Sequence, residues 1–599
     1  MLLKPLFVTF GLWAQFLIAF GQNDSLNNWL EQIISRIDAD DFNESAYNRL
    51  MEMIGDLELN RRDTIFPTRI KQNIILRSDL CLNIREGFHN TTPEKIEQNK
   101  AYRGDYWNHT VRYKIQAGNE WSGGFVLNKD AGEPFQSHYP FFDSFNYYIS
   151  YKPERKTMMV DRIIAGKYRV GLGAGLLLNQ QFSLGKSVLQ DMFMSGSAML
   201  SPHASTDEYN YMHGVAVELS RKHLKLLPFV SYKKIDAVIK NDTITSIPTD
   251  GMHRTNTEES KRDKASVMNA GLHASYAFKW AELGMNILYT RFSVPFVRPI
   301  RNYNTNYFRG QQLWQGSFDY HLRRFGFVLK GETAIDQNGN IATINQISHR
   351  LGEDWKASVI YRYLAQKYQQ LYAATATESS STQGENGVMM AIEGEPFAYW
   401  KVNCKFDYFF LGNINYGFDK PLHGFDLRTQ AQYSKGSTTA NISYRLKYKE
   451  NLLHNLDLSL KVAVTDGINL KTQMRGKIYS SHKKGGYSLG YAIAQAVEWK
   501  RETSPLSAEI QCAWFDAKDY DCRLYISERN ILYGFGLPML YGQGIRANAV
   551  GTWKMSQNLT LDLKYSIYHY CDRNHISSGL QQIWGKNQQN LWLQLRVMI

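Results

Sequence analysis

One stretch of the sequence has the residue types of a phosphate-binding loop. The segment Lys167–Ser187 reads KYRVGLGAGLLLNQQFSLGKS, with glycines early in the run and a closing Gly-Lys-Ser triplet. A P-loop follows the pattern G-x-x-x-x-G-K-[ST], which requires glycine where this chain has Gln180, and no βαβ pattern follows. The sequence therefore argues against nucleotide binding. Glycines in a strand more often allow a bend or the close approach of another segment, and we expect that role here.

Signatures of metal binding and hydrolysis are missing as well. The 15 histidines form no H-E-x-x-H motif, and the pair Cys571 and His575 is isolated. A Ser–His–acid triad is recognised by geometry, so a hydrolase stays open as a weaker hypothesis. The sequence indicates no catalytic residue, no metal ligand and no cofactor. Cys512 and Cys522 flank a predicted turn, and they either pair as a disulfide or serve as small apolar residues.

The charged residues of most interest are basic and alternate with apolar residues. Arg445 and Lys447 do so in NISYRLKYK (441–449), and Lys564 does so in NLTLDLKYSIYHY (558–570). Successive side chains of a strand point to opposite faces, so each segment has one apolar and one polar side. We expect the polar sides to line one aqueous space and to favour anions. The basic residues predicted to face it are Arg428, Arg445, Lys447, Lys564 and Arg596.

The same alternation recurs along the chain, for example in 425–433, 487–499 and 591–599. Many such segments with few helical patterns between them predict an all-β protein built on one large antiparallel sheet of about 22–24 strands. A sheet that closes on itself leaves no unpaired backbone edge, and with its apolar side outward it is stable in lipid. The fold class predicted is a large antiparallel transmembrane β-barrel with a short α-helical leader.

Composition agrees with such a barrel. Mean hydropathy is −0.41 over 599 residues, as expected when polar lumen-facing residues dilute the apolar ones. Aromatic residues make up 13% of the chain, which fits girdles at the two membrane interfaces. The formal net charge of +13 fits a wet lumen and contacts with lipopolysaccharide phosphates, and it predicts no specific nucleic-acid partner.

Three regions follow from the patterning. Residues 1–21 have a basic start, an apolar run and a small-x-small site, which predict a cleaved signal peptide and a Gram-negative outer-membrane location. Residues 22–66 form a periplasmic leader, with two amphipathic helical stripes that either dock at the barrel mouth or on a partner or stay loosely ordered. Residues 67–599 form the barrel. Long polar insertions are expected as outer loops at 183–211, 240–264, 298–307 and 367–386.

Five segments spread in order along the mature chain carry a family resemblance. They are GGFVLNKDAGEPF (123–135), AGKYRVGLGAGLLLNQQFSLGKS (165–187), ITSIPTDGMHRTNTEE (244–259), YQQLYAATATESSSTQGENGVMMAIEGEP (368–396) and ERNILYGFGLPMLYGQGIRANA (528–549). Together they resemble a group of large bacterial outer-membrane barrels known as helix-hairpin-helix domain-containing proteins. The resemblance implies a barrel and carries no assigned chemistry.

One departure from that group bears on function. Its members usually carry helix-hairpin-helix units between the leader and the barrel. The hairpin of such a unit contains a glycine, and its backbone amides bind phosphate. Here Leu57–Arg69 reads LELNRRDTIFPTR and has no such glycine. The DNA binding that the group's name implies therefore transfers to no residue of this chain.

The leading functional hypothesis is a non-enzymatic channel or docking barrel for polar or anionic cargo. A second hypothesis is a structural or interaction barrel that contacts an envelope secretion or assembly machine through residues 23–59 and 367–386. An outer-membrane hydrolase and a DNA-uptake component are weaker alternatives. The partners expected in every case are outer-membrane lipid and lipopolysaccharide.

Overall fold

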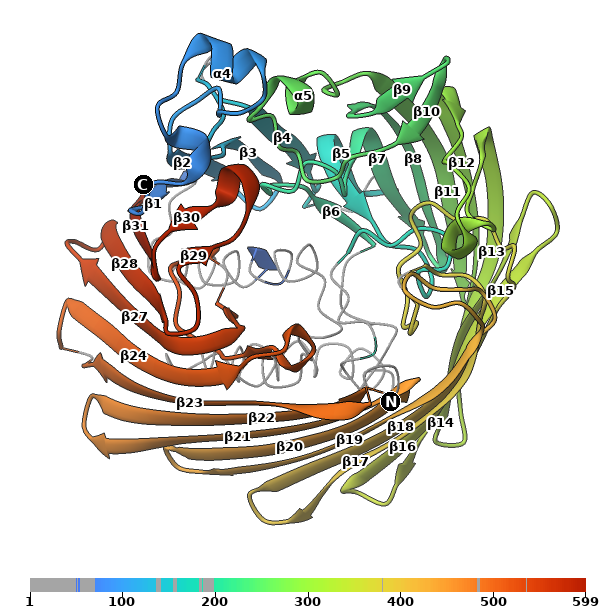
Figure 1. The fold of residues 1–599 in the computed structure, drawn as a ribbon. Helices are drawn as coiled ribbons and strands as arrows, with labels where there is room; N and C mark the ends of the chain where they lie inside the picture. Colours follow the sequence, from blue (N-terminus) through green and yellow to red (C-terminus); the bar gives the residue numbers. More distant parts are fainter. Residues whose placement is uncertain are drawn as a thin grey trace.

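The computed structural model describes residues 50, 52–53, 70–135, 142–154, 159–181, 186, 199–379, 381–481, 485–501, 503–534 and 536–599. In Figure 1 they form a closed ring of strands around a lumen that other segments of the chain enter. The predicted signal peptide (1–21) lies outside the described residues, and so does almost all of the leader (22–66). Among the described residues, no helix is both long and apolar enough to cross a membrane.

The barrel wall is one antiparallel sheet in which each strand pairs with the next along the chain. Its strands are β1 (Ile70–Cys81), β2 (Trp107–Ala117), β3 (Trp121–Lys129), β4 (Ser144–Tyr151), β5 (Val160–Val170), β7 (Met212–Arg221), β8 (Leu224–Ile235), β11 (Ala265–Ala277), β12 (Ala281–Phe296), β13 (Gly310–Arg324), β14 (Phe327–Asp336), β15 (Ile341–Leu351), β16 (Trp355–Leu364), β17 (Glu385–Phe397), β18 (Trp400–Leu411), β19 (Leu422–Lys435), β20 (Thr438–Lys449), β21 (Asn451–Thr465), β22 (Ile468–Ser481), β23 (Gly486–Lys500), β24 (Leu506–Ala517), β27 (Gly542–Lys554), β28 (Leu559–Tyr570) and β31 (Asn587–Met598).

The last strand of the wall pairs with the first. β31 lies antiparallel to β1, with Val597 opposite Ile74, and this pairing closes the sheet. The described sheet has 27 strands, and the short β6 (Leu200–Pro202), β9 (Val238–Lys240) and β10 (Thr243–Ser246) only extend it, so the closed wall has 24. The all-β barrel of about 22–24 strands predicted from the sequence is confirmed.

The remaining described elements are small and lie in the connections. Two hairpins are formed by β25 (Leu524–Tyr525) with β26 (Met539–Leu540), and by β29 (His575–Ile576) with β30 (Ile583–Trp584). The short helices are α4 (Pro93–Glu97), α5 (Asn256–Glu259), η3 (Glu86–Phe88), η5 (Asn302–Asn304), η6 (Tyr520–Cys522) and η7 (Gly579–Gln581). A capping box at Thr255 and Glu258 starts α5.

The wall buries its polar side and exposes its apolar side, the reverse of a soluble sheet. On β28, Asp562 and Lys564 are 2% and 1% exposed, whereas Leu563 between them is 48% exposed. The same exposure of large apolar residues recurs around the barrel, as at Ile149, Val230, Met268, Ile510 and Leu593. An outward apolar band on a closed sheet is the arrangement that lipid requires. The protein is therefore a transmembrane β-barrel of the outer-membrane type.

The two ends of the barrel differ in their connections. One end has short turns, such as 118–120, 325–326 and 436–437, and it also holds the start of β1 and the end of β31. The other end has the long connections, which include all four insertions predicted from the sequence. In outer-membrane barrels the short turns face the periplasm, so we expect the long connections to face outward.

Candidate functional site in the barrel lumen

Arg428 and Arg445 lie opposite each other on neighbouring strands. β19 and β20 pair in a register that places these two arginines side by side on the inner face of the wall. Both bind Asp426: its Oδ2 lies 3.0 Å from Nη2 of Arg428 and 2.8 Å from Nη2 of Arg445. Like charges directly opposite each other destabilise a sheet, and a shared carboxylate removes that repulsion.

Lys447 and Lys564 are also bound to acidic groups inside the barrel. Nζ of Lys447 lies 2.8 Å from Oε1 of Glu378, and Nζ of Lys564 lies 2.8 Å from Oε1 of Glu528. Both acids come from connections rather than from the wall. These two lysines therefore tie segments inside the lumen to the wall.

Arg596 completes the set of basic residues predicted from the sequence. Its Nε lies 2.8 Å from Oδ2 of Asp562 on the neighbouring strand β28. Each of the five predicted residues thus has an acidic partner, and the lumen does not present them as free positive charge. Asp426 and Asp562 sit at alternate strand positions, and the alternation that revealed the bases could have revealed them. Nothing local marks Glu378 or Glu528.

The glycine-rich segment after β5 folds into the barrel and packs against its inner wall. Leu172, Leu176, Leu177 and Leu178 are all 1% exposed or less, and they join a cluster with wall residues of β14–β17. Oε2 of Glu332 on β14 accepts hydrogen bonds from the backbone N–H groups of Ala174, at 2.7 Å, and Leu176, at 3.1 Å. We call residues 171–181 the first inner segment.

Two of its glycines are needed for this close approach. A Cβ atom on Gly173 would lie 2.7 Å from the carboxyl carbon of Glu332, and one on Gly175 would lie 2.4 Å from the carbonyl oxygen of Ala374. Both residues also have positive φ, +52° and +86°, which favours glycine. The glycines that resembled a phosphate loop therefore serve the packing of this segment.

The insertion predicted at 367–386 as an outer loop instead folds into the lumen. Tyr368 is fully buried, and its hydroxyl donates to the carbonyl of Leu176 at 3.0 Å. Backbone N–H of Asn179 donates to the carbonyl of Tyr372 at 3.0 Å. Residues 368–379 are the second inner segment, and it packs on the first because both carry apolar and backbone groups that must be covered.

A buried ion network fixes the second inner segment to the wall. Nζ of Lys186 lies 2.7 Å from Oε2 of Glu378 and 2.5 Å from Oδ2 of Asp407. Asp407 also receives Nη1 of Arg362 at 2.8 Å, and Nε of that arginine lies 2.5 Å from Glu385. Such a network replaces hydration only while every member keeps its partner.

A third inner segment, residues 524–534, lies against the opposite wall, where Figure 1 shows the orange part of the chain reaching inward. Its anchor is Glu528, whose two oxygens bind Nε and Nη2 of Arg546 at 2.9 and 2.8 Å in addition to Lys564. Ser527 adds hydrogen bonds to Gln473 on β22, including its carbonyl at 2.8 Å from Nε2. The wall thus holds this segment through polar groups.

The described residues of the leader also lie inside the barrel. Leu50 is fully buried, and Oε2 of Glu52 lies 2.9 Å from Nη2 of Arg169 on β5. The leader was expected at the periplasmic mouth or on a partner, and these residues lie deeper than the mouth. Sequence periodicity gave the helical stripe but carries no information on where it docks.

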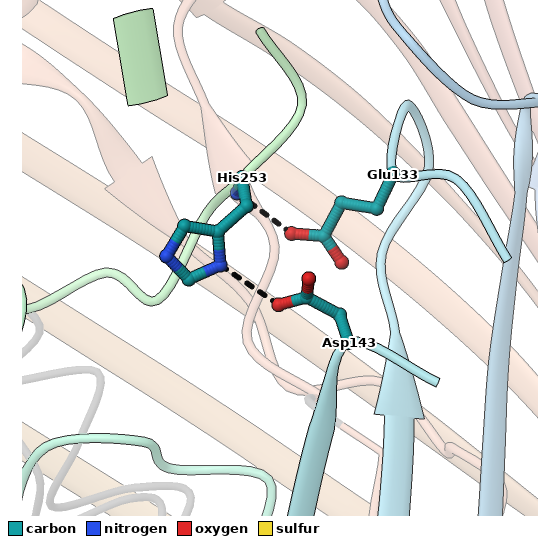
Figure 2. A group of neighbouring side chains, drawn as sticks. All are labelled: Glu133, Asp143 and His253. Carbon is teal, nitrogen blue, oxygen red and sulfur yellow. Dashed lines mark hydrogen bonds and ion pairs between the residues drawn. The ribbon is translucent and has the colours of Figure 1, made fainter. Parts of the chain in front are cut away.

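In the connection between β10 and α5, His253 lies between two carboxylates. Its Nδ1 lies 2.8 Å from Oδ2 of Asp143, and its Nε2 lies 2.8 Å from Oδ2 of Asp236. Figure 2 shows Asp143 on one side of the ring and Glu133 at the backbone, where the N–H of His253 donates to Oε1 of Glu133 at 2.8 Å. Arg262 binds Asp143 as well. We call these residues the His253 cluster.

The electrostatics of the His253 cluster favour an ion-pair network over a metal site. Burial would lower the pKa of His253, but hydrogen bonds with Asp143 and Asp236 outweigh it and raise that pKa to about 10. Burial, aided by the charges of Asp130 and Asp143, raises the pKa of Glu133 to about 8. Three of the side chains are close enough to share a cation. However, a protonated imidazole with both nitrogens donating has no lone pair for one.

Cys512 and Cys522 do not form the disulfide that was one of the two expectations. Cys512 is exposed on the outer side of β24, whereas Cys522 is buried in η6 inside the barrel, and both are free. Because the wall lies between them, they serve as small apolar residues.

No family model matches this chain, and no curated protein matches it. Several solved structures align with it at low similarity. A mutant ferric enterobactin receptor of Pseudomonas aeruginosa aligns over 89% of this chain and 81% of its own, with 8% identity and a TM-score of 0.43. The siderophore receptor PirA of Acinetobacter baumannii aligns over 89% of this chain and 81% of its own, with 7% identity and a TM-score of 0.44. The FrpB iron transporter of Neisseria meningitidis aligns over 88% of this chain and 82% of its own, with 9% identity and a TM-score of 0.41. At this level of similarity the alignments do not indicate what this barrel transports.

Proposed function

We propose that this protein is a non-enzymatic outer-membrane transport barrel for polar cargo, and that its own inner segments restrict the lumen at rest. The observation that carries the proposal is the way these segments are held. Glu378 and Glu528 each bind lumen lysines, and both acids belong to inner segments rather than to the wall. Ion pairs and hydrogen bonds can be exchanged for water, so segments held in this way can be released when cargo competes for the same groups.

The width of the wall supports the same proposal. A barrel with this many strands encloses more space than its own wall side chains fill, and an aqueous path remains unless something occupies it. Three inner segments occupy part of that space among the described residues. A barrel with a purely structural role could instead be closed by them permanently, and this is the second candidate function.

Planar-bilayer recording distinguishes the two functions. We expect small or rare conductance from the wild-type barrel, and several-fold larger conductance when residues 527–534 are replaced by a Gly-Ser linker of the same length. A matched control replaces Asn241 and Asp242, which form the exposed turn between β9 and β10, with glycine. The control should conduct like the wild type.

A linker variant that inserts and shows heat-modifiable gel migration but conducts no more than the wild type would refute the transport proposal and favour the structural barrel. Clear cation preference in an open variant would argue against anionic cargo.

A further inference from the structure

Glu52 reaches far into the barrel. It belongs to the leader, which precedes β1, and β1 begins at the short-turn end. Its partner Arg169 is next to last in β5, which ends at the long-connection end. The ion pair is nearly buried, with side-chain exposures of 9% for Arg169 and 12% for Glu52. A carboxylate of the leader therefore lies inside the barrel, beside the end of β5 that faces the long connections.

A cavity of about 50 Å³ lies beside this carboxylate, and arginines from two wall strands line it. Arg77 comes from β1 and Arg112 from β2, and Tyr533 of the third inner segment lies between them. The guanidinium of Arg112 lies 4.0 Å from the centre of the Tyr533 ring and donates to the carbonyl of Ala204. Thr110 and Gln594 add a hydroxyl and an amide to the lining.

The wall supplies less negative charge here than positive charge. Arg77 has Asp79 as a partner at 3.1 Å. Among the described residues, Arg112 has no carboxylate partner. Arg169 pairs with Glu52, and the carboxylate of Asp207 also interacts with it electrostatically. Nε of Arg169 is buried without a hydrogen bond to any described atom. A buried guanidinium group without a counter-charge is costly, so an anion that enters the cavity would stabilise Arg112.

We propose that this cavity binds an oxyanionic group of the cargo, a carboxylate or a phosphate, and that Glu52 occupies the site at rest as an internal competitor. This inference rests on the proposed transport function and names the chemistry of its cargo. Guanidinium forks bind carboxylate and phosphate oxygens in pairs, and a partly buried site strengthens those bonds. Glu52 itself lines the cavity, so an arriving oxyanion meets its negative charge there, and the binding of one opposes the binding of the other.

This competition links the outer end of the lumen to the leader. By thermodynamic linkage, the factor by which a held Glu52 weakens anion binding is also the factor by which a bound anion weakens the hold on Glu52. Anion binding in the lumen therefore changes how the leader is held at Glu52.

Calorimetric titration of inorganic phosphate into the detergent-solubilised full-length protein tests the inference, with ionic strength fixed by sodium chloride. We expect Glu52→Gln, which keeps the shape and removes the charge, to bind phosphate about tenfold more tightly than the wild type. Glu52→Asp keeps the competitor and should stay near the wild type. Arg77→Gln and Arg112→Gln, which remove the two guanidinium groups that line the cavity, should each weaken binding by about tenfold or more.

Matched controls are Glu97→Gln on α4 and Arg221→Gln at the end of β7, both exposed and far from the cavity in the fold. Heat-modifiable gel migration identifies variants that fold. Phosphate affinity that Glu52→Gln leaves unchanged would overturn the competition, and affinity that Arg77→Gln and Arg112→Gln leave unchanged would overturn the site. The titration is independent of the conductance test of the transport proposal. A barrel that conducts but binds no phosphate refutes this inference only, and a barrel that binds phosphate but never conducts refutes transport only.

Discussion

At the scale of single residues, the His253 cluster makes one connection at the long-connection end sensitive to pH. The folded-state pKa of His253 is about 10, above the ordinary value near 6.5. A group whose pKa rises on folding contributes stability that is complete below its unfolded pKa and is lost as pH rises through its folded pKa. Glu133, with its pKa raised to about 8, contributes with the same sign.

We therefore predict that residues 248–260 lose protection as the pH rises from about 6.5 to about 10. Hydrogen-exchange protection factors of this segment, corrected for the intrinsic pH dependence, measure the effect. A His253→Gln variant should be less protected at pH 6.5 and should show a flatter pH profile. Equal profiles in the two proteins would show that His253 does not hold this connection.

Gly175 gives a second prediction at this scale. Gly175→Ala places a Cβ against the carbonyl of Ala374 in a backbone conformation that disfavours it, so we expect a local cost of about 1–3 kcal/mol. Faster exchange of the Leu176 amide, which donates to Glu332, should report it. The matched control is Gly339→Ala, at a similar φ of +80° but with no atom within 4 Å of the new Cβ. If the control perturbs the Leu176 amide equally, the effect is a general loss of stability and not the local contact at Gly175.

At the scale of elements, acids from inner segments bind lysines inside the lumen. Glu528 joins β27 to β28 through Arg546 and Lys564, and Glu378 accepts from Lys186 and Lys447. The segment and the wall therefore depend on each other: the segment needs anchors, and the wall needs counter-charges. Of the five basic residues predicted to face the lumen, Lys447 and Lys564 are neutralised in this way, whereas the three arginines pair with the wall acids Asp426 and Asp562.

We predict that Glu528→Gln weakens the anchoring of the third inner segment by about 3–5 kcal/mol, because it leaves two buried cations without their carboxylate. Hydrogen exchange around Ser527 should quicken, and brief channel openings should become more frequent in bilayers. The double variant Glu528→Gln with Lys564→Met removes one of the stranded charges and should recover part of the loss. Additive effects of the two changes would contradict the coupling.

At the scale of the whole molecule, closure of the wall depends on the pairing of β1 with β31. Leu76 lies opposite Leu595 in that pairing. In a background without native cysteines, Leu76→Cys with Leu595→Cys should form a disulfide in the folded barrel, since directly opposed strand residues have the required spacing. Leu76→Cys with Leu593→Cys, two residues out of register, should cross-link poorly. Equal cross-linking of both pairs would contradict the register.

The division between sequence and tertiary structure follows the range of each interaction. Alternation along a strand is local, and it determined the barrel, the outward direction of residues such as Leu563 and the inward direction of Lys564 and Arg596. Connection lengths located the four insertions for the same reason. The tertiary structure decided what meets across the lumen: Glu528 with Lys564, Glu378 with Lys447, Glu52 with Arg169, and three segments folded inward. Those partners lie far apart along the chain, and no spacing rule joins them, because only closure of the wall brings them within reach of one another.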